Sequence, residues 1–203
     1  YQVATLEDIL RDHVAPYGIP ASVGAELPAV PNFSVSTGSS EWQVVYEFCR
    51  YYGGIAPRFD RYGRLVIAPW PDGERRVLGA DTAVTRLTLR DQRYGVLSQV
   101  LVRDRTSEEV QTVADGDFLR RGGRSRRVLT MPGKSSYQAM RYSGEYQLEQ
   151  ARKELRTLEL ELPRAFAAWP GELVELRLAQ NVGTGLWRVR ESVSALEERG
   201  SYT

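Results

Sequence analysis

Residues 36–68 read STGSSEWQVVYEFCRYYGGIAPRFDRYGRLVIA, and this stretch predicts a helix followed by a β-hairpin. Ser40 and the glutamine three positions later have the spacing of a capping box, in which side chains satisfy free backbone amides at a helix start. The apolar residues that recur at helical spacing are Trp42, Val45, Cys49 and Tyr52. Gly53-Gly54 ends the pattern, because glycine readily adopts the left-handed conformation of a helix C-terminus. We therefore expect a helix over 40–52 and a hairpin over 55–68.

The residues before this stretch complete a small α+β domain over 1–73. Thr5 and Asp8 nearly match a capping box and begin an earlier helix. A loop rich in proline and glycine follows the hairpin at 69–73, and such a loop is typical of a domain boundary. We therefore place the boundary between the two domains after residue 73.

Residues 74–203 change to alternating strands and predict a mostly antiparallel, β-barrel-like tube domain. Barrel closure would remove the exposed edges that long strands otherwise leave. One long helix is inserted over about 136–158, and residues 115–133 are polar and irregular. The expected strands lie at 84–89, 96–102, 110–114, 158–162, 173–178 and 186–193. The fold class is therefore α+β, a small strand-helix-hairpin domain followed by a tube domain.

The composition excludes several classes of enzyme and binding protein. The chain has 203 residues, with 27 Lys+Arg against 26 Asp+Glu, and so a net charge of +1. One cysteine rules out an internal disulfide and a Cys-rich zinc site, and one histidine rules out His-rich metal catalysis. No run of apolar residues has the length of a membrane span. We expect no cofactor and no metal, and the balanced charge argues against global attraction to nucleic acid.

Candidate catalytic side chains are few, and each has a simpler structural interpretation. His13 has the chemistry of a general base, but its helical position favours a surface or helix-terminal histidine. Cys49 has the chemistry of a nucleophile, but its apolar helix face favours a small buried residue. Three carboxylates, Glu145, Glu149 and Glu154, have the chemistry of glycosidase groups. Their position on one helix beside basic residues favours a solvated face with helical ion pairs. We therefore expect no catalytic site.

The densest charge cluster is the segment RRGGRSRR over residues 120–127. Its guanidinium groups belong to Arg120, Arg121, Arg124, Arg126 and Arg127. Three interpretations remain open, namely a clamp for phosphates, a loop that docks on an acidic partner, and a poorly ordered segment. No aromatic residue lies within the cluster, which argues against base stacking with single-stranded nucleic acid. We treat the five arginines as a candidate interaction loop.

The order of these motifs resembles the baseplate hub proteins of tailed phages. The resemblance starts from the Gly-Ser-Ser-x-Trp sequence at 38–42, the helix end at Gly53-Gly54, and the hairpin closed by Asp60-x-x-Gly63-x-Leu65. Such late-control-D-like hubs are similar to the central hub of contractile tails and to the hub part of type VI secretion spikes. Further short matches are Thr5-Leu-Glu-Asp-Ile-Leu10, Tyr17-Gly-Ile19, Ala151-Arg-Lys-Glu-Leu155, Pro170-Gly-Glu-Leu-Val174, Trp187-Arg-Val189 and Ser201-Tyr-Thr203.

The resemblance implies a structural role in a phage or prophage tail. Such hubs form homotrimeric rings that join a sixfold tail tube to a threefold spike or tip. The implied partners are other copies of the subunit, the tail tube, distal tail and baseplate proteins, the spike or tip protein and the tape-measure protein, with DNA only in transit. The implied location is the virion tail or baseplate, assembled in the bacterial host cytoplasm. A first tube-like barrel is expected to precede Tyr1, and the last strand is expected to be incomplete.

Two functions from other classes are the alternatives. One is a component of a tail-associated peptidoglycan hydrolase, for which Glu145, Glu149 and Cys49 are the residues to test. The other is a nucleic-acid-binding module built on the arginine loop, which predicts salt-sensitive DNA binding. The hub interpretation requires no catalytic constellation, and we expect no enzymatic activity in this chain.

Overall fold

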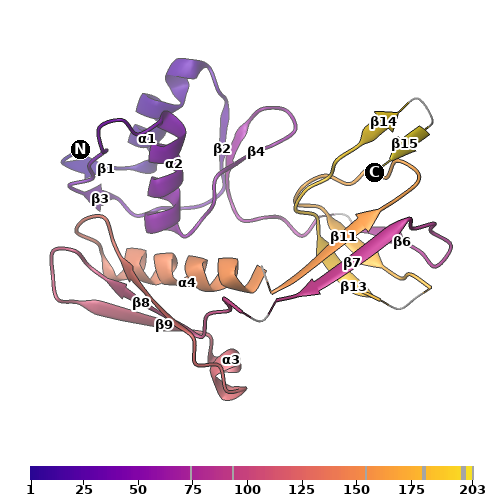
Figure 1. The fold of residues 1–203 in the computed structure, drawn as a ribbon. Coiled ribbons are helices and arrows are strands. Elements are labelled where there is room, and N and C mark those ends of the chain that lie inside the picture. The colour runs from indigo at the N-terminus through magenta and orange to yellow at the C-terminus, as the bar shows by residue number, and fades with distance from the viewer. Residues whose placement is uncertain (74, 93, 154, 180–181, 198–199, 203) are drawn as a thin grey trace. The chain divides into compact units, whose positions relative to one another are not determined.

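The computed structural model describes residues 1–203 except 74, 93, 154, 180–181, 198–199 and 203. The chain has the expected α+β fold, with helices and several small sheets (Figure 1). It divides into two compact units. Unit 1 consists of Tyr1–Pro69 and Tyr94–Glu154, and unit 2 consists of Trp70–Arg93 and Leu155–Thr203.

The first segment of unit 1 contains two helices whose starts are capped as the sequence predicts. At the start of α1 (Leu6–His13), the Thr5 hydroxyl accepts from the Asp8 amide at 3.2 Å, and the Asp8 carboxylate accepts from the Thr5 amide at 3.0 Å. At the start of α2 (Glu41–Phe48), the Ser40 hydroxyl accepts from the Gln43 amide at 3.2 Å. The other elements here are β1 (Val3–Ala4), η1 (Ala15–Tyr17), β2 (Ala21–Val23), β3 (Val30–Pro31) and η2 (Cys49–Gly53).

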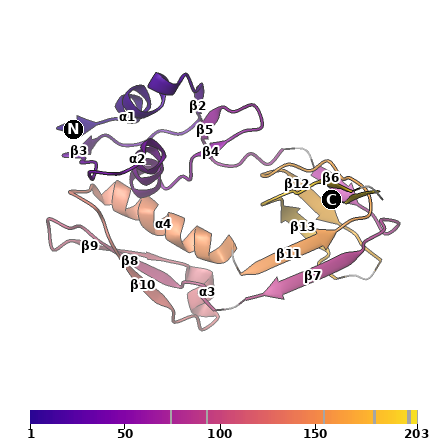
Figure 2. The same cartoon turned by 45° about the horizontal axis from the view of Figure 1, so that its top comes forward.

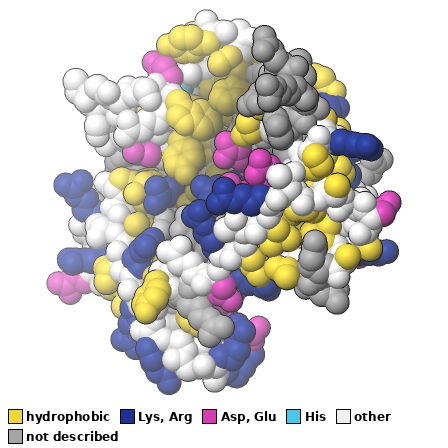
Figure 3. All heavy atoms as spheres, turned by 45° about the vertical axis from the view of Figure 1, so that its right-hand side comes forward, with side chains coloured by type: hydrophobic (Ala, Val, Ile, Leu, Met, Phe, Trp, Pro, Cys, Tyr) yellow, Lys and Arg dark blue, Asp and Glu magenta, His cyan; other side chains and the backbone are white. Residues whose placement is uncertain are grey.

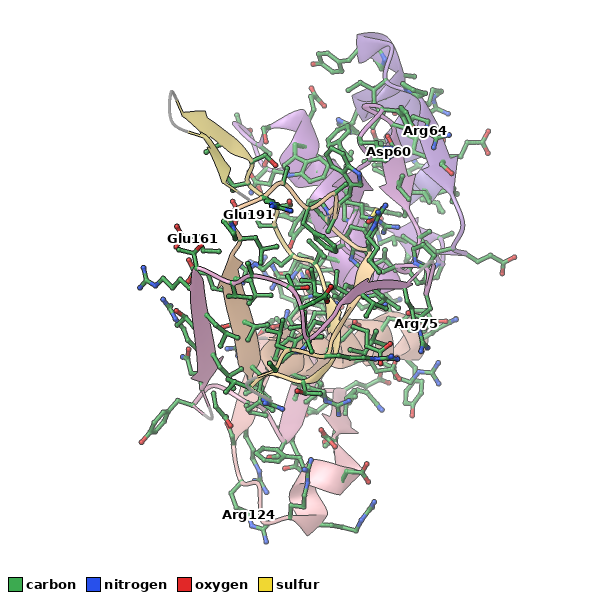
Figure 4. The ribbon with its side chains drawn as sticks, turned by 90° about the vertical axis from the view of Figure 1, so that its right-hand side faces the viewer. Asp60, Arg64, Arg75, Arg124, Glu161 and Glu191 are labelled. Atoms are coloured by element: carbon green, nitrogen blue, oxygen red, sulfur yellow. The ribbon has the colours of Figure 1, made fainter. Side chains whose placement is uncertain are left out.

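The hairpin consists of β4 (Arg58–Phe59) and β5 (Leu65–Ile67), which pair antiparallel. Its turn is held by Asp60, whose carboxylate accepts from the Tyr62 amide at 2.9 Å and from the Arg64 amide at 3.0 Å. Asp60 also pairs with the Arg64 side chain at 2.7 Å (Figure 4). β2 extends this sheet by pairing parallel to β5. Local hydrogen bonds from Asp60 thus close the turn of the hairpin.

The second segment of unit 1 forms a three-stranded sheet covered by one long helix. The strands have the order β10-β8-β9, with β10 parallel and β9 antiparallel to β8. The helix α4 lies between this sheet and η2 (Figures 1 and 2). The elements are β8 (Gln99–Arg103), β9 (Val110–Ala114), α3 (Gly116–Arg120), β10 (Arg126–Thr130) and α4 (Tyr137–Lys153).

The core of unit 1 joins residues from both of its segments. Phe48 is fully buried and meets the Phe33 ring edge-on, with 5.2 Å between ring centroids. Met140 from α4 and Val100 from β8 belong to the same apolar cluster. Gly144 lets α4 pack closely on the sheet, since a Cβ there would stand 2.5 Å from a methyl group of Val113. The two segments therefore share one core.

Unit 2 is built from strands around a second, smaller apolar core. β7 (Arg86–Asp91) pairs antiparallel with β11 (Arg156–Glu161), and β14 (Ala195–Glu197) pairs antiparallel with β15 (Gly200–Tyr202). β12 (Leu173–Leu176) pairs parallel with β6 (Arg75–Leu78) and antiparallel with β13 (Gly185–Arg188). The buried core residues are Leu78, Leu162, Ala168, Val174, Leu176 and Leu178.

The structure corrects the predicted tube. The described strands form no closed barrel, because β7 and β11 pair only with each other while β6, β12 and β13 form a separate sheet. The structure also groups residues 94–154 with residues 1–69, rather than dividing the chain once after residue 73. The reason is that α4 buries its apolar face against η2 and β8. The long helix ends at Lys153 rather than near 158, and the segment 115–133 contains α3 and β10.

Asp104 is a buried carboxylate that connects two loops of unit 1. It is 2% exposed and accepts hydrogen bonds from the Thr106 amide at 2.7 Å, the Thr106 hydroxyl at 2.9 Å and the Ser135 amide at 3.0 Å. Burial alone raises the pKa of Asp104, but the bonds from Thr106 and Ser135 outweigh it and hold the pKa below its ordinary value. The ionised form therefore stabilises the fold.

We expect Asp104→Asn to lower the free energy of unfolding by about 1.5–3 kcal/mol at pH 7, because a charged acceptor of several hydrogen bonds is lost. Because the pKa of Asp104 is lower in the folded state, its carboxylate stabilises the fold fully above the unfolded pKa of about 3.9. This stabilisation is lost as the pH falls through the folded-state pKa. The difference in free energy of unfolding between variant and wild type, measured from urea unfolding curves, should therefore shrink below about pH 4. Glu108→Gln, at an exposed position, is the control, and a gap equal at pH 7 and pH 3 would contradict the assignment.

Candidate functional site

The five predicted arginines lie on one projecting segment but in different settings. Arg120 ends α3 and pairs with Asp117, and its side chain is 75% exposed. Arg121 and Arg124 are exposed and donate only to backbone carbonyl groups of Asp117, Leu119 and Gly123. Figure 4 shows Arg124 at the lower end of the ribbon. The segment therefore presents several guanidinium groups to solvent.

The last two arginines lie on β10 and point to opposite faces of the sheet. Arg127 donates to the Gln147 side chain of α4 at 3.0 Å, so it faces the helix. Because successive side chains of a strand alternate, Arg126 faces the side away from α4. Both side chains are exposed, and the hydrogen bond from Arg127 to α4 anchors the segment.

The base of the segment is fixed by the buried Ser98. Its amide and hydroxyl donate to the Ser125 carbonyl at 2.9 and 2.6 Å, and its own carbonyl accepts from the Asp115 amide at 2.9 Å. Asp115 also caps α3 and pairs with Arg152 of α4. The bond from the Phe118 amide lowers the pKa of Asp115 below its ordinary value, and Arg152 lowers it further. Both ends of the segment are therefore held together.

The paired glycines of this segment form a tight turn rather than a flexible hinge. Gly122 has φ +93°, a backbone conformation that favours glycine. Gly123 lies against the Phe118 ring, and a Cβ there would stand 2.6 Å from a ring carbon. Their amides donate to the carbonyls of Leu119 and Phe118 at 3.0 and 2.9 Å. The arginines are consequently displayed on an ordered loop.

An apolar groove on unit 1 is the main feature that the sequence reasoning missed. It has a volume of about 360 Å³ and lies between α1, α2 and the hairpin. Three aromatic side chains with large exposed fractions contribute to it, Tyr17 at 62%, Trp42 at 42% and Phe59 at 49%. The Trp42 and Phe59 ring centroids are 5.4 Å apart. Hydrophobic side chains gather in a band on the face drawn in Figure 3.

The sequence held a weak signal for this groove. Trp42 shares the helical spacing of the apolar residues Val45 and Cys49. It lies in the first turn of α2, however, beyond the end of the hydrophobic cluster. Exposed aromatic residues that gather in a concavity are typical of interaction sites. The groove is therefore a candidate contact surface.

Two of the candidate catalytic residues, His13 and Cys49, take part in contacts that stabilise the fold. His13 lies at the end of α1, where Nδ1 meets the Glu41 carboxylate and Nε2 is 3.0 Å from the Tyr1 hydroxyl. These contacts connect α1 with the start of α2. Cys49 is fully buried, and burial raises the pKa of its thiol to about 12, so the thiol is protonated at neutral pH.

The carboxylates of α4 form helical ion pairs. Glu145 pairs with Arg141 at 3.5 Å and Glu149 pairs with Lys153 at 2.7 Å, and both carboxylates are exposed. Glu154 lies outside the described residues. Among the residues that the structure describes, no group of His, Cys, Asp and Glu side chains has the arrangement of a metal site. Within the same residues, no helix is both long and apolar enough to cross a membrane.

The fold is similar to that of phage and prophage tail proteins. The tail protein from Neisseria meningitidis MC58 matches with a TM-score of 0.74 and 15% identity, over 98% of this chain and 64% of that chain. The 43 kDa tail protein of prophage MuSo2 from Shewanella oneidensis matches with a TM-score of 0.68 and 15% identity, over 99% of this chain and 63% of that chain. The present chain thus spans less than two thirds of either protein.

A further similar structure belongs to a complete particle. A chain from the virion of a native gene transfer agent matches with a TM-score of 0.55 and 18% identity, over 97% of this chain and 44% of that chain. No family model and no curated protein sequence matches the chain. At these identities the structural matches establish a shared fold.

Proposed function

We propose that this chain is a structural part of a phage or prophage tail, within a baseplate or tail-tip hub subunit of the late-control-D-like kind. The observation that carries the proposal is the match of nearly the whole chain to a tail protein fold. In this role the subunit forms a homotrimeric ring and joins the tail tube to the spike or tip. Its other partners are the distal tail and baseplate proteins and the tape-measure protein, and the complex resides in the virion after assembly in the host cytoplasm.

The surface chemistry of unit 1 supports an assembly role without catalysis. The groove around Trp42 and Phe59 presents aromatic side chains of the kind enriched at protein interfaces. Cys49 is held as a buried thiol, and Glu145 and Glu149 are paired on an exposed helix face. These arrangements suit a subunit whose task is to contact other subunits, and we infer that the chain has no enzymatic activity.

The trimeric ring is tested by measuring the mass of the full-length subunit that carries this chain. We expect a species of three subunits in light scattering or native mass spectrometry, at micromolar concentration and moderate salt. Electron microscopy of the same species should show a ring with threefold symmetry. A subunit that stays monomeric under these conditions and is absent from purified tails would contradict the hub assignment. Lytic activity on peptidoglycan that is lost with Glu145→Ala or Glu149→Ala would favour the hydrolase instead.

A further inference from the structure

We propose that the loop between β9 and β10 binds the phosphate backbone of double-stranded DNA. The binding groups are the guanidinium groups of Arg120, Arg121, Arg124 and Arg126. We call these four side chains the guanidinium surface. The proposal goes beyond the tail role, because it assigns a ligand to a surface of this chain alone.

The first argument is charge that the protein leaves without a carboxylate partner. Within the described part of the chain, no carboxylate pairs with Arg121, Arg124 or Arg126. The pair between Arg120 and Asp117 is exposed on both sides, and such pairs contribute little and exchange readily. Four guanidinium groups are therefore available to an anion. Arg side chains suit this task because their planar fork can bind two phosphate oxygens at once.

The balanced net charge of the whole chain does not oppose this local binding. At an ionic strength of about 0.1 M, charges more than about 10 Å apart are largely screened from each other. A DNA phosphate near the loop therefore responds to the local arginines rather than to the sum of +1 over the chain. Lys and Arg side chains surround the lower end of the molecule in Figure 3, where Figure 1 places α3.

The second argument is that the loop is already ordered. Ser98 holds its two ends together, Asp115 pairs with Arg152, and Arg127 is bonded to Gln147. The turn at Gly122 adds further internal hydrogen bonds. Binding then costs mainly the side-chain entropy of the arginines, because the backbone loses little freedom.

The side chains around the arginines favour DNA over an acidic protein. Protein interfaces usually have an apolar centre, whereas the exposed side chains over 120–127 are arginine and serine, with one exposed valine, Val128, following them. Phe118 and Leu119 are half-buried, and the Phe118 ring lies against Gly123. No aromatic side chain of this loop is therefore available to stack on unpaired bases, which favours the backbone of a duplex over single strands.

The test is the salt dependence of binding to a short labelled DNA duplex, measured by fluorescence anisotropy with the full chain. Four phosphate contacts predict a slope of log K against log salt of about −3.6, and so about a hundredfold loss of affinity between about 50 and 200 mM salt. The variant Arg121→Gln/Arg124→Gln/Arg126→Gln should reduce the slope to about −0.9 and the loss to about fourfold. The same positions changed to lysine should keep the steep slope, since the charges remain.

The matched control removes the same charge from other exposed positions, as Arg11→Gln/Arg61→Gln/Arg141→Gln. We expect this control to keep the slope of the wild type, which would tie binding to the guanidinium surface rather than to net charge. Equal slopes for the two glutamine variants would overturn the proposal. Failure of the wild type to bind DNA at low salt would also overturn the proposal. If the wild type then bound poly-glutamate, the guanidinium surface would be assigned to an acidic protein partner. Neither result depends on whether the subunit forms trimers.

Discussion

Gly144→Leu should unfold unit 1 or lower its free energy of unfolding by at least about 3 kcal/mol. Gly144 lies in the middle of α4, against the sheet formed by β8 and β9. A Cβ at this position would stand 2.5 Å from one methyl group of Val113 and 3.1 Å from a methyl group of Val102. Both valines are buried, so a leucine forces α4 away from the sheet. Circular dichroism during urea unfolding measures the loss.

The matched control for this prediction is Glu145→Leu, which adds a leucine one position further along the same helix. Glu145 is exposed, so the free energy of unfolding should change by less than about 0.5 kcal/mol. Gly144→Ala should fall between the two, because alanine improves helix propensity by about 1 kcal/mol while its Cβ still crowds Val113. Equal stability of Gly144→Leu and Glu145→Leu would contradict the close packing of α4 on the sheet.

Phe48→Ala should lower the free energy of unfolding by about 3–5 kcal/mol, the usual cost of removing a buried aromatic ring. Phe48 is fully buried and contacts two other rings, Phe33 at 5.2 Å and Tyr52 at 5.6 Å between centroids. The cavity left by the variant lies where α2 meets the rest of the core, and the surrounding residues can collapse into it only in part. Thermal or urea unfolding of the variant and the wild type measures this loss in free energy of unfolding.

Phe59→Ala removes the same side chain from the apolar groove and serves as the comparison. Phe59 is 49% exposed, so its loss should cost less than about 1 kcal/mol. Phe48→Leu, which keeps most of the buried volume, should cost less than about 1.5 kcal/mol. If Phe48→Ala and Phe59→Ala were equally stable, the position of the core in unit 1 would be wrong.

Local signals in the sequence were sufficient where the stabilising contacts are themselves local. The cap at Ser40 and the turn at Asp60 depend on residues within four positions, and both lie where the sequence places them. The end of α4 was harder to predict. Leu155 and Leu158 fit a helical spacing as well as the alternation of a strand, and the structure assigns Leu158 to β11.

Features that depend on distant contacts were not predictable in the same way. Gly144 has the appearance of a weak point in a helix, yet the structure uses it to bring α4 against Val113. The sequence indicates a cluster of arginines at 120–127. The fixed conformation of their loop depends on Ser98 and Arg152, which no local pattern connects to the cluster. The groove combines Tyr17, Trp42 and Phe59 from three separate elements. Contacts between residues that are distant in the sequence are determined by the tertiary fold and leave only weak signals in a single sequence.

The division of unit 1 into two chain segments also bears on how the protein is synthesised. Residues 49–53 pack against a helix that begins at Tyr137, so roughly eighty residues must be added before this contact can form, which takes about 4 to 17 s at usual rates of translation. Through that interval the first segment lacks the helix that completes its core. We expect the first segment to expose apolar surface until α4 has been synthesised, and slow translation between residues 54 and 136 to prolong this exposure.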